Sequence, residues 1–311
     1  MGLRGMTRWA VTRWAVAGLV AVGLAGCGSD ASGRGEGDPG VPSVKADEDL
    51  PELPLERYEF STRDNRRHTE AQARMARSCM RKLGFEDFPL HPKQPQGSVT
   101  LNAVAMSSYP YGPLDLDSAR RWGYGWDPEL SPADGARHEG RAMTADEHKA
   151  MYGLSREPAE GCARSGTERL TEGVRDKRRM WTYAPGRSRS LDKAVAEDKR
   201  VREALDTWSD CVESKGAKRY KTPGDAFRDK AWHRGSDRGG NTGQTKKELA
   251  TATADVECKR EHNTAGVWWA VREEKQRADL ARHKDVYEAV RADQDRVRAN
   301  VRRVLGGAHP R

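Results

Sequence analysis

The chain has 311 residues, and its 55 lysines and arginines outnumber its 47 aspartates and glutamates, which gives a formal net charge of +8. The basic residues are interspersed with acidic ones, whereas nucleic-acid-binding proteins concentrate them on one face, so we expect no nucleic-acid partner. Hydrophobic residues make up 36% of the chain and charged residues 33%. This lean supply of apolar side chains predicts a mainly α-helical protein with narrow apolar stripes rather than a large sheet core.

Residues 1–26 have the layout of a secretory signal peptide. Three arginines and no acidic residue precede a short apolar stretch, which ends in Leu24-Ala25-Gly26-Cys27. Small residues before a cysteine form a lipobox, so we predict cleavage before Cys27 and attachment of a diacylglyceryl group to its thiol. This predicts a lipid anchor on the extracytoplasmic face of the cell membrane. The alternative is an uncleaved spanning anchor, which needs about 20 apolar residues, and only Trp14 to Gly26 is free of charge.

The next segment, residues 27–56, is predicted to be the lipidated N-terminus and a flexible tether. It is rich in glycine, proline, serine and acidic residues, and its apolar residues show no period. A flexible chain of this length has a mean reach of roughly 30 Å. We expect the remaining residues, 57–311, to form a helical extracytoplasmic domain.

A weak internal repeat runs through this domain. A predicted helix over 69–83 ends at Gly84, and a second over 190–215, with Ser190 as its N-cap, ends at Gly216. In both, a cysteine lies five residues before the glycine, and a stretch containing proline follows. The repeat predicts two related halves, about 57–185 and 186–311.

Beyond Cys27 the cysteines are even in number: Cys79, Cys162, Cys211 and Cys258. In an exported chain this predicts two disulfides, for which three pairings exist. The repeat favours pairing within each half, Cys79 with Cys162 and Cys211 with Cys258. No two cysteines are spaced as CxxC, so we expect neither a zinc site nor a redox-active pair.

Further helices are predicted from local signals. Capping boxes start at Thr144, in a helix that ends at Gly153, and at Thr245. The segment 267–305 contains no proline or glycine, and as a single helix it would span about 58 Å. Its valine-rich seven-residue series make a weak coiled-coil seam, which favours packing along the domain at its start and exposure towards its end. The alternative is a projecting arm that binds a partner.

The aromatic run Trp122, Tyr124 and Trp126 is the best candidate for ligand binding. Alternating rings on an extended segment can present flat faces to sugar rings or to a peptide of the cell wall. The alternative, which we favour, is that these rings cover a core that is short of bulky side chains.

Motifs of established enzymes are absent from the sequence. It contains no GxSxG, HExxH, SxxK or P-loop, and its eight histidines are scattered. We therefore expect no catalytic residues, no metal site and no cofactor.

Several segments between residues 70 and 270 are framed by glycine, cysteine and aromatic residues: Cys79-Met80 to Gly84-Phe85, Arg121-Trp122-Gly123-Tyr124, Met151-Tyr152-Gly153, Gly161-Cys162, Trp208-Ser209-Asp210-Cys211 and Ala254-Asp255-Val256-Glu257-Cys258-Lys259. Together with the lipobox, they resemble a family of actinobacterial secreted lipoproteins of unknown function. The resemblance implies a location and an architecture, and no activity.

The expected function is thus a non-enzymatic accessory or binding role at the cell envelope. The expected partners are the membrane, through the N-terminal lipid, and an envelope protein. The alternative is a module that binds cell-wall glycan or peptide through the aromatic run.

Overall fold

The computed structural model describes residues 40–92, 111–125, 140–153, 161–232 and 244–306. These residues form ten α-helices and no β-strand, which confirms the predicted mainly helical fold. None of the described helices is long and apolar enough to cross a membrane. The predicted signal peptide and Cys27 lie outside the described residues.

The α-helices, in chain order, are α1 (Thr62–Lys82), α3 (Leu116–Trp122), α5 (Ala145–Tyr152), α6 (Cys162–Leu170), α7 (Lys177–Ala196), α8 (Lys199–Ser214), α9 (Pro223–Phe227), α10 (Lys246–Glu261), α11 (Thr264–Arg282) and α12 (Lys284–Gly306). Short 3-10 turns are η1 (Asp47–Asp49), η2 (Glu56–Tyr58) and η5 (Lys230–Trp232).

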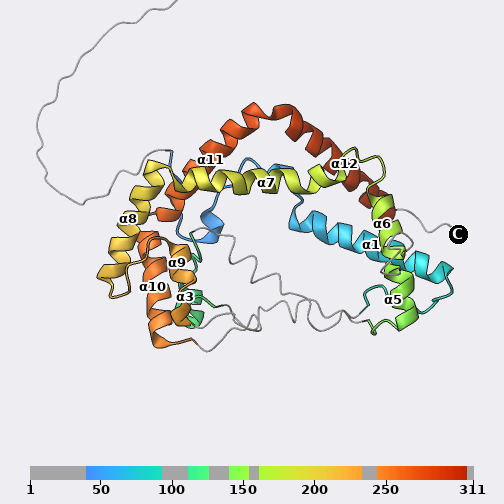
Figure 1. The fold of residues 1–311 in the computed structure, drawn as a ribbon, viewed down its shortest axis with the longest axis horizontal. Helices are drawn as coiled ribbons and strands as arrows, with labels where there is room; N and C mark the ends of the chain where they lie inside the picture. The colour runs from blue at the N-terminus through green and yellow to red at the C-terminus, as the bar shows by residue number, and fades with distance from the viewer. Residues whose placement is uncertain (1–39, 93–110, 126–139, 154–160, 233–243, 307–311) are drawn as a thin grey trace, which may run out of the picture. The chain divides into compact units, whose positions relative to one another are not determined.

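Two groups of helices surround the disulfides. We call α1, α5 and α6 the first stapled region, and α3, α8, α9 and α10 the second stapled region; in each, the helices pack on one another (Figure 1). Helix α7 packs on α11 and α12, α11 also contacts α8 and α10, and α12 also contacts α1 and α6. The predicted boundary between the two halves, at residues 185 and 186, falls inside α7. Helix α3 belongs to the first half of the sequence but packs on α10, which belongs to the second.

Both disulfides have the pairing that the repeat favoured. Cys79 is bonded to Cys162 with their Cα atoms 5.6 Å apart, and Cys211 is bonded to Cys258 with a separation of 5.8 Å. Each joins the end of one long helix to a second helix of the same stapled region.

The helix ends that revealed the repeat are alike in structure. Gly84 has φ of 93° and Gly216 has φ of 85°, a left-handed conformation that a residue with a Cβ adopts only at a cost. In both, the next N–H bonds back into the last turn: that of Phe85 donates to the Met80 carbonyl and that of Ala217 to the Val212 carbonyl. This is the Schellman pattern, which satisfies carbonyls at a helix end.

Two predicted helices have different bounds in the structure. The helix predicted over 190–215 is broken, because α7 ends at Ala196 and α8 begins at Lys199. Ser190 is therefore not an N-cap; it lies inside α7, and its hydroxyl donates to the Arg187 carbonyl. Asp198 caps α8 instead, accepting from the Arg200 N–H at 3.1 Å.

The segment predicted as one helix over 267–305 is two helices, α11 and α12. They meet at His283, whose φ of −123° and ψ of 28° leave the α-helical region. Helix α12 remains the long C-terminal helix that was expected. One face of its last turns is buried, however, since Val297 and Val301 lie in a core with Leu170 and Met180.

The predicted tether is too long, because its second part is packed onto the domain. Residues 42–61, here called the strap, follow α11 and α12 and contribute buried side chains, among them Val44 and Leu55. The Val44 N–H donates to the side-chain oxygen of Asn263, and the Leu55 N–H to that of Gln276. Further along, the side-chain amide of Gln294 donates to the strap at the Tyr58 carbonyl.

Candidate functional site

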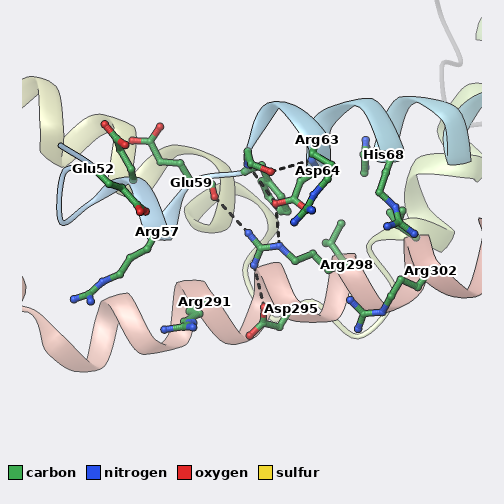
Figure 2. Close-up of a pocket in the computed structure, with 16 residues that line it drawn as sticks. Glu52, Arg57, Glu59, Arg63, Asp64, His68, Arg291, Asp295, Arg298 and Arg302 are labelled. Carbon is green, nitrogen blue, oxygen red and sulfur yellow. Dashed lines mark hydrogen bonds and ion pairs between the residues drawn. The ribbon is translucent and has the colours of Figure 1, made fainter. Parts of the chain in front are cut away.

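A groove of about 550 Å³ lies where the strap meets α1 and α12 (Figure 2). Pockets that hold small ligands have volumes of about 300–1,000 Å³, so its size fits a ligand or a short chain segment. We call it the arginine groove, after the side chains that line it: Arg57, Arg63, Arg67, Arg291, Arg298 and Arg302.

Arg298 holds the centre of the groove together. Its Nε donates to Asp64 at 3.1 Å, its Nη1 to Asp295 at 2.9 Å, and its Nη2 to the strap at the Glu59 carbonyl at 3.4 Å. Its guanidinium also lies 5.2 Å from the centre of the Phe60 ring. Arg298 thereby joins α12 to α1 and the strap, and its guanidinium is fully paired by these contacts.

Three other arginines keep their charge available at one end. Arg63 and Arg67 lie one turn apart on α1, and Arg302 lies on α12. All three are exposed, and none makes an ion pair or side-chain hydrogen bond with another described residue. Arg63 also stands in the first turn of its helix, where the macrodipole disfavours a cation. This end of the groove therefore has unpaired guanidinium groups that can donate hydrogen bonds to an anion.

An aromatic wall borders the same end. The ring of Trp181 lies 4.3 Å from that of Phe60 and 5.6 Å, edge on, from that of His68. The Nε2 atom of His68 is buried and has no hydrogen-bond partner among the described residues. Burial lowers the pKa of His68, so the imidazole is neutral at neutral pH and the positive charge here comes from the arginines.

Glutamates gather at the opposite end: Glu52, Glu56 and Glu59. Burial raises the pKa of Glu56 and of Glu59, and the neighbouring carboxylates add to the effect. None of the three makes an ion pair within the described part of the chain. The groove thus carries charge of opposite sign at its two ends.

A second charged cluster is buried in the second stapled region. Lys259 and Asp255 are fully buried, and the Lys259 ammonium donates to Asp255 at 3.2 Å, to the Tyr111 carbonyl at 2.7 Å and to the Pro113 carbonyl at 2.5 Å. The indole N–H of Trp208 donates to Asp255 at 3.0 Å. Burial lowers the pKa of Lys259 and raises that of Asp255, and their mutual attraction opposes both shifts. With its donors used and no exposed face, the pair pins residues 111–113 to α10.

The aromatic run is placed only in part. Tyr124 is fully buried, with ring centres 5.8 Å from Phe227 and 6.1 Å from Trp232, so its faces are used in the core. Trp122 is half-buried at the end of α3. Trp126 lies outside the described residues. Tyr124 is therefore a core residue, while the role of Trp122 and Trp126 stays a prediction.

Only one group in the described part of the chain has metal-ligand proximity: Cys211, Glu261 and His262, whose ligand atoms lie within 4.8 Å of one another. The Cys211 sulfur is bonded to Cys258 and is therefore not a thiolate. The group does not make a metal site.

The arginine groove was missed in the sequence, although a signal for it exists. Arg291, Arg298 and Arg302 are seven and four residues apart, which places them on one face of a helix. Arg63 and Arg67 are four apart. That the two helices face each other is a tertiary fact, which no local pattern contains.

Comparisons with protein-family models, with curated proteins and with solved structures found no match to this chain. The resemblance to actinobacterial secreted lipoproteins therefore stays a prediction.

Proposed function

We propose that this chain is a lipid-anchored extracytoplasmic protein with a non-enzymatic binding role at the cell envelope. In this proposal the arginine groove is its binding surface, and an anionic group of an envelope partner is its ligand. The lipobox at Cys27 supports the location, and the groove supports the mode of binding.

The observation that supports the binding role is a set of unpaired arginines from two facing helices: Arg63, Arg67 and Arg302. A guanidinium presents planar donors that match a carboxylate or a phosphate in two parallel hydrogen bonds. Exposed arginines without a partner are common on protein surfaces, but these three line the same groove. Three that converge without a partner favour a ligand over a structural role.

The other side chains of the groove favour binding over catalysis. Its hydroxyl, that of Ser61, accepts from the Asp64 N–H and so caps α1. Its imidazole, that of His68, contacts the Trp181 ring edge on. These groups are engaged in holding the groove in shape.

The strap sets how far the domain can stand from a lipid on Cys27. Packing begins at Pro42, whose carbonyl accepts from the Asn263 side-chain amide at 2.9 Å. Fully extended residues span at most about 3.5 Å each, so the 15 residues from Cys27 to Pro42 cover at most about 50 Å. The proposed anchor would keep the domain next to the membrane.

The anchor is tested by fractionation of cells that express the full chain. Cys27→Ala should move the protein from the membrane fraction to the soluble fraction or block its processing, and mass spectrometry should find a diacylglyceryl thioether on wild-type Cys27. An unmodified cysteine on a membrane-bound protein would contradict the proposed anchor.

The binding role is tested with the full chain in detergent micelles and polyglutamate as an anionic probe. Replacing Arg67 and Arg302 together by glutamine should weaken binding at least tenfold, because two charge-assisted contacts are lost. The control is Arg66→Gln, an exposed arginine on the same helix that does not line the groove. Because the control removes one charge and the double variant two, a roughly threefold loss in the control would mean that only net charge matters.

A further inference from the structure

We propose that the natural occupant of the arginine groove is dipolar: a short extended peptide segment with a carboxylate at one end and an ammonium group at the other. This inference rests on the proposed function and adds to it the chemistry of the ligand. It comes from the order of charges along the groove.

The two ends of the groove differ in sign. Figure 2 shows Glu52 and Glu59 on one side, Arg298 near the centre, and His68 and Arg302 on the other side. The basic end has three unpaired arginines. Its acidic residue, Asp64, is paired, because its carboxylate accepts hydrogen bonds from Arg298 and from the Ser61 N–H.

The acidic end also contains two arginines, Arg57 and Arg291. The Arg57 guanidinium lies 5.2 Å from the centre of the Tyr58 ring, and in Figure 2 it points away from the glutamates. Arg291 lies on α12 across from the strap. Neither forms an ion pair with Glu52, Glu56 or Glu59, so three carboxylates remain for a cation.

Two of these carboxylates, those of Glu56 and Glu59, are partly desolvated. Burial raises the pKa of both, and the attraction of Arg272 only partly opposes this shift, so an ammonium group bound beside them would lower the cost of their charge. A ligand of uniform negative charge would gain at the arginines and lose at the glutamates. Only a ligand that carries both signs gains along the whole groove.

The charges in the middle of the groove are paired with one another, and this part of the wall is partly apolar. Arg298 is balanced by Asp64 and Asp295. Phe60, Val297 and Val301 also line the wall. A peptide backbone with small side chains suits such a middle, since it needs neither a charge nor a deep pocket.

The length of the groove sets the length of the ligand. Arg291 and Arg302 are 11 residues apart on α12, which is about 16 Å along the helix. An extended chain rises about 3.3 Å per residue, so about five residues span this distance. The volume of about 550 Å³ is large enough for one such segment.

The probe is pentaalanine with both termini free, titrated into the full chain in detergent micelles and followed by changes in tryptophan fluorescence and by NMR of the peptide. Two matched probes are the same peptide N-acetylated and the same peptide C-amidated. Each blocked peptide should bind about tenfold more weakly than the free one, because each loses one charged contact.

Variants then assign each terminus to one end of the groove. In Arg67→Gln combined with Arg302→Gln, amidation should no longer weaken binding, while acetylation should still do so. In Glu56→Gln combined with Glu59→Gln, acetylation should lose its effect and amidation should keep it. The controls, Arg66→Gln and Glu86→Gln, change exposed charges outside the groove and should keep both effects.

Failures of the two proposals look different. If amidation weakens binding and acetylation does not, the groove binds anions and the dipolar ligand is wrong. If no pentaalanine binds while polyglutamate binds through the arginines, the dipolar inference is likewise overturned and the proposed function stands. If neither probe depends on Arg67 and Arg302, both proposals fail.

Discussion

The two stapled regions end their long helices in the same way and place their disulfides alike, yet their interiors differ. The first has a small core around Met80, Phe88 and the Cys79–Cys162 disulfide. The second buries Trp208 and Trp232 in a larger aromatic core. What recurs is therefore the helix end and the covalent staple, while the packing around them is free to differ.

Their charges differ in the same sense. In the first region Arg141 pairs with Glu147 beside solvent, with 47% of the arginine side chain exposed. In the second region Lys259 and Asp255 have no exposure. In the second region a buried ion pair holds the interior together. In the first region the ion pair lies at the surface, and α1 also carries Arg63 and Arg67, which line the groove.

Removing the disulfides should give the largest effects. Replacing Cys79 and Cys162 by alanine should lower the free energy of unfolding by about 4.5 kcal/mol, and replacing Cys211 and Cys258 by about 4 kcal/mol. The difference follows from the sequence separations of 83 and 47 residues. Urea denaturation of both pairs checks this order, which would be wrong if the second pair cost clearly more than the first.

Breaking the buried pair of Lys259 and Asp255 should lower the free energy of unfolding by about as much as removing a disulfide. Its effect on local structure should be confined to the second stapled region. Lys259→Met leaves the Asp255 carboxyl buried without its partner, which typically costs about 3–5 kcal/mol. Adding Asp255→Leu should restore part of the loss, because no unpartnered carboxyl then remains in the core. Hydrogen exchange should quicken in α8 and α10 and stay slow in α1 and α6. Equal quickening in both regions would contradict the local role of the pair.

The helix ends should respond equally, which tests whether they are a true repeat. Gly84→Ala and Gly216→Ala each put a Cβ on a left-handed residue, with no neighbouring atom within 4 Å of it. The cost should be backbone strain alone, about 1–2 kcal/mol in each case. Thermal unfolding of the two variants should give matching losses, and a loss at one site only would break the equivalence.

The last effect concerns the pH dependence of the first region. Hydrogen bonds from Arg141 lower the pKa of Glu147 from 4.5 to about 2. A carboxyl with a lowered pKa in the folded state stabilises the protein above pH 4.5, and this contribution is lost as the pH falls towards 2. Glu147→Gln should therefore be less stable than the wild type at pH 6, and the difference should shrink steadily as the pH falls from 4.5 towards 2. A constant difference across this range would show that Glu147 does not act through its charge.

Local signals in the sequence predicted local structure well. The capping box at Thr144, the glycine helix ends and the disulfide pairing all depend on residues close in the chain or on a repeat. The prediction for Ser190 was wrong because a serine hydroxyl can either cap a helix or donate to a carbonyl one turn earlier in the same helix. In the structure Ser190 does the latter, and Asp198, eight residues later, is the N-cap of α8.

Tertiary contacts explain the remaining errors. The strap has no apolar period, because side-chain amides of Asn263, Gln276 and Gln294 bind its backbone and no regular partner sets its spacing. The arginine groove needs the strap, α1 and α12 together, from the two ends of the chain. Neither feature can be read from one segment.

The strap has a mechanical consequence. A pull on the chain from a lipid at Cys27 would load the Asn263 contacts first, and Gln276 and Gln294 would bear force only after the earlier contacts had opened. Residues 42–58 would then detach one contact at a time, up to an extended length of about 55 Å. The same segment that holds the domain close under no load would become a spring-like extension under tension, and its full release would undo one wall of the arginine groove.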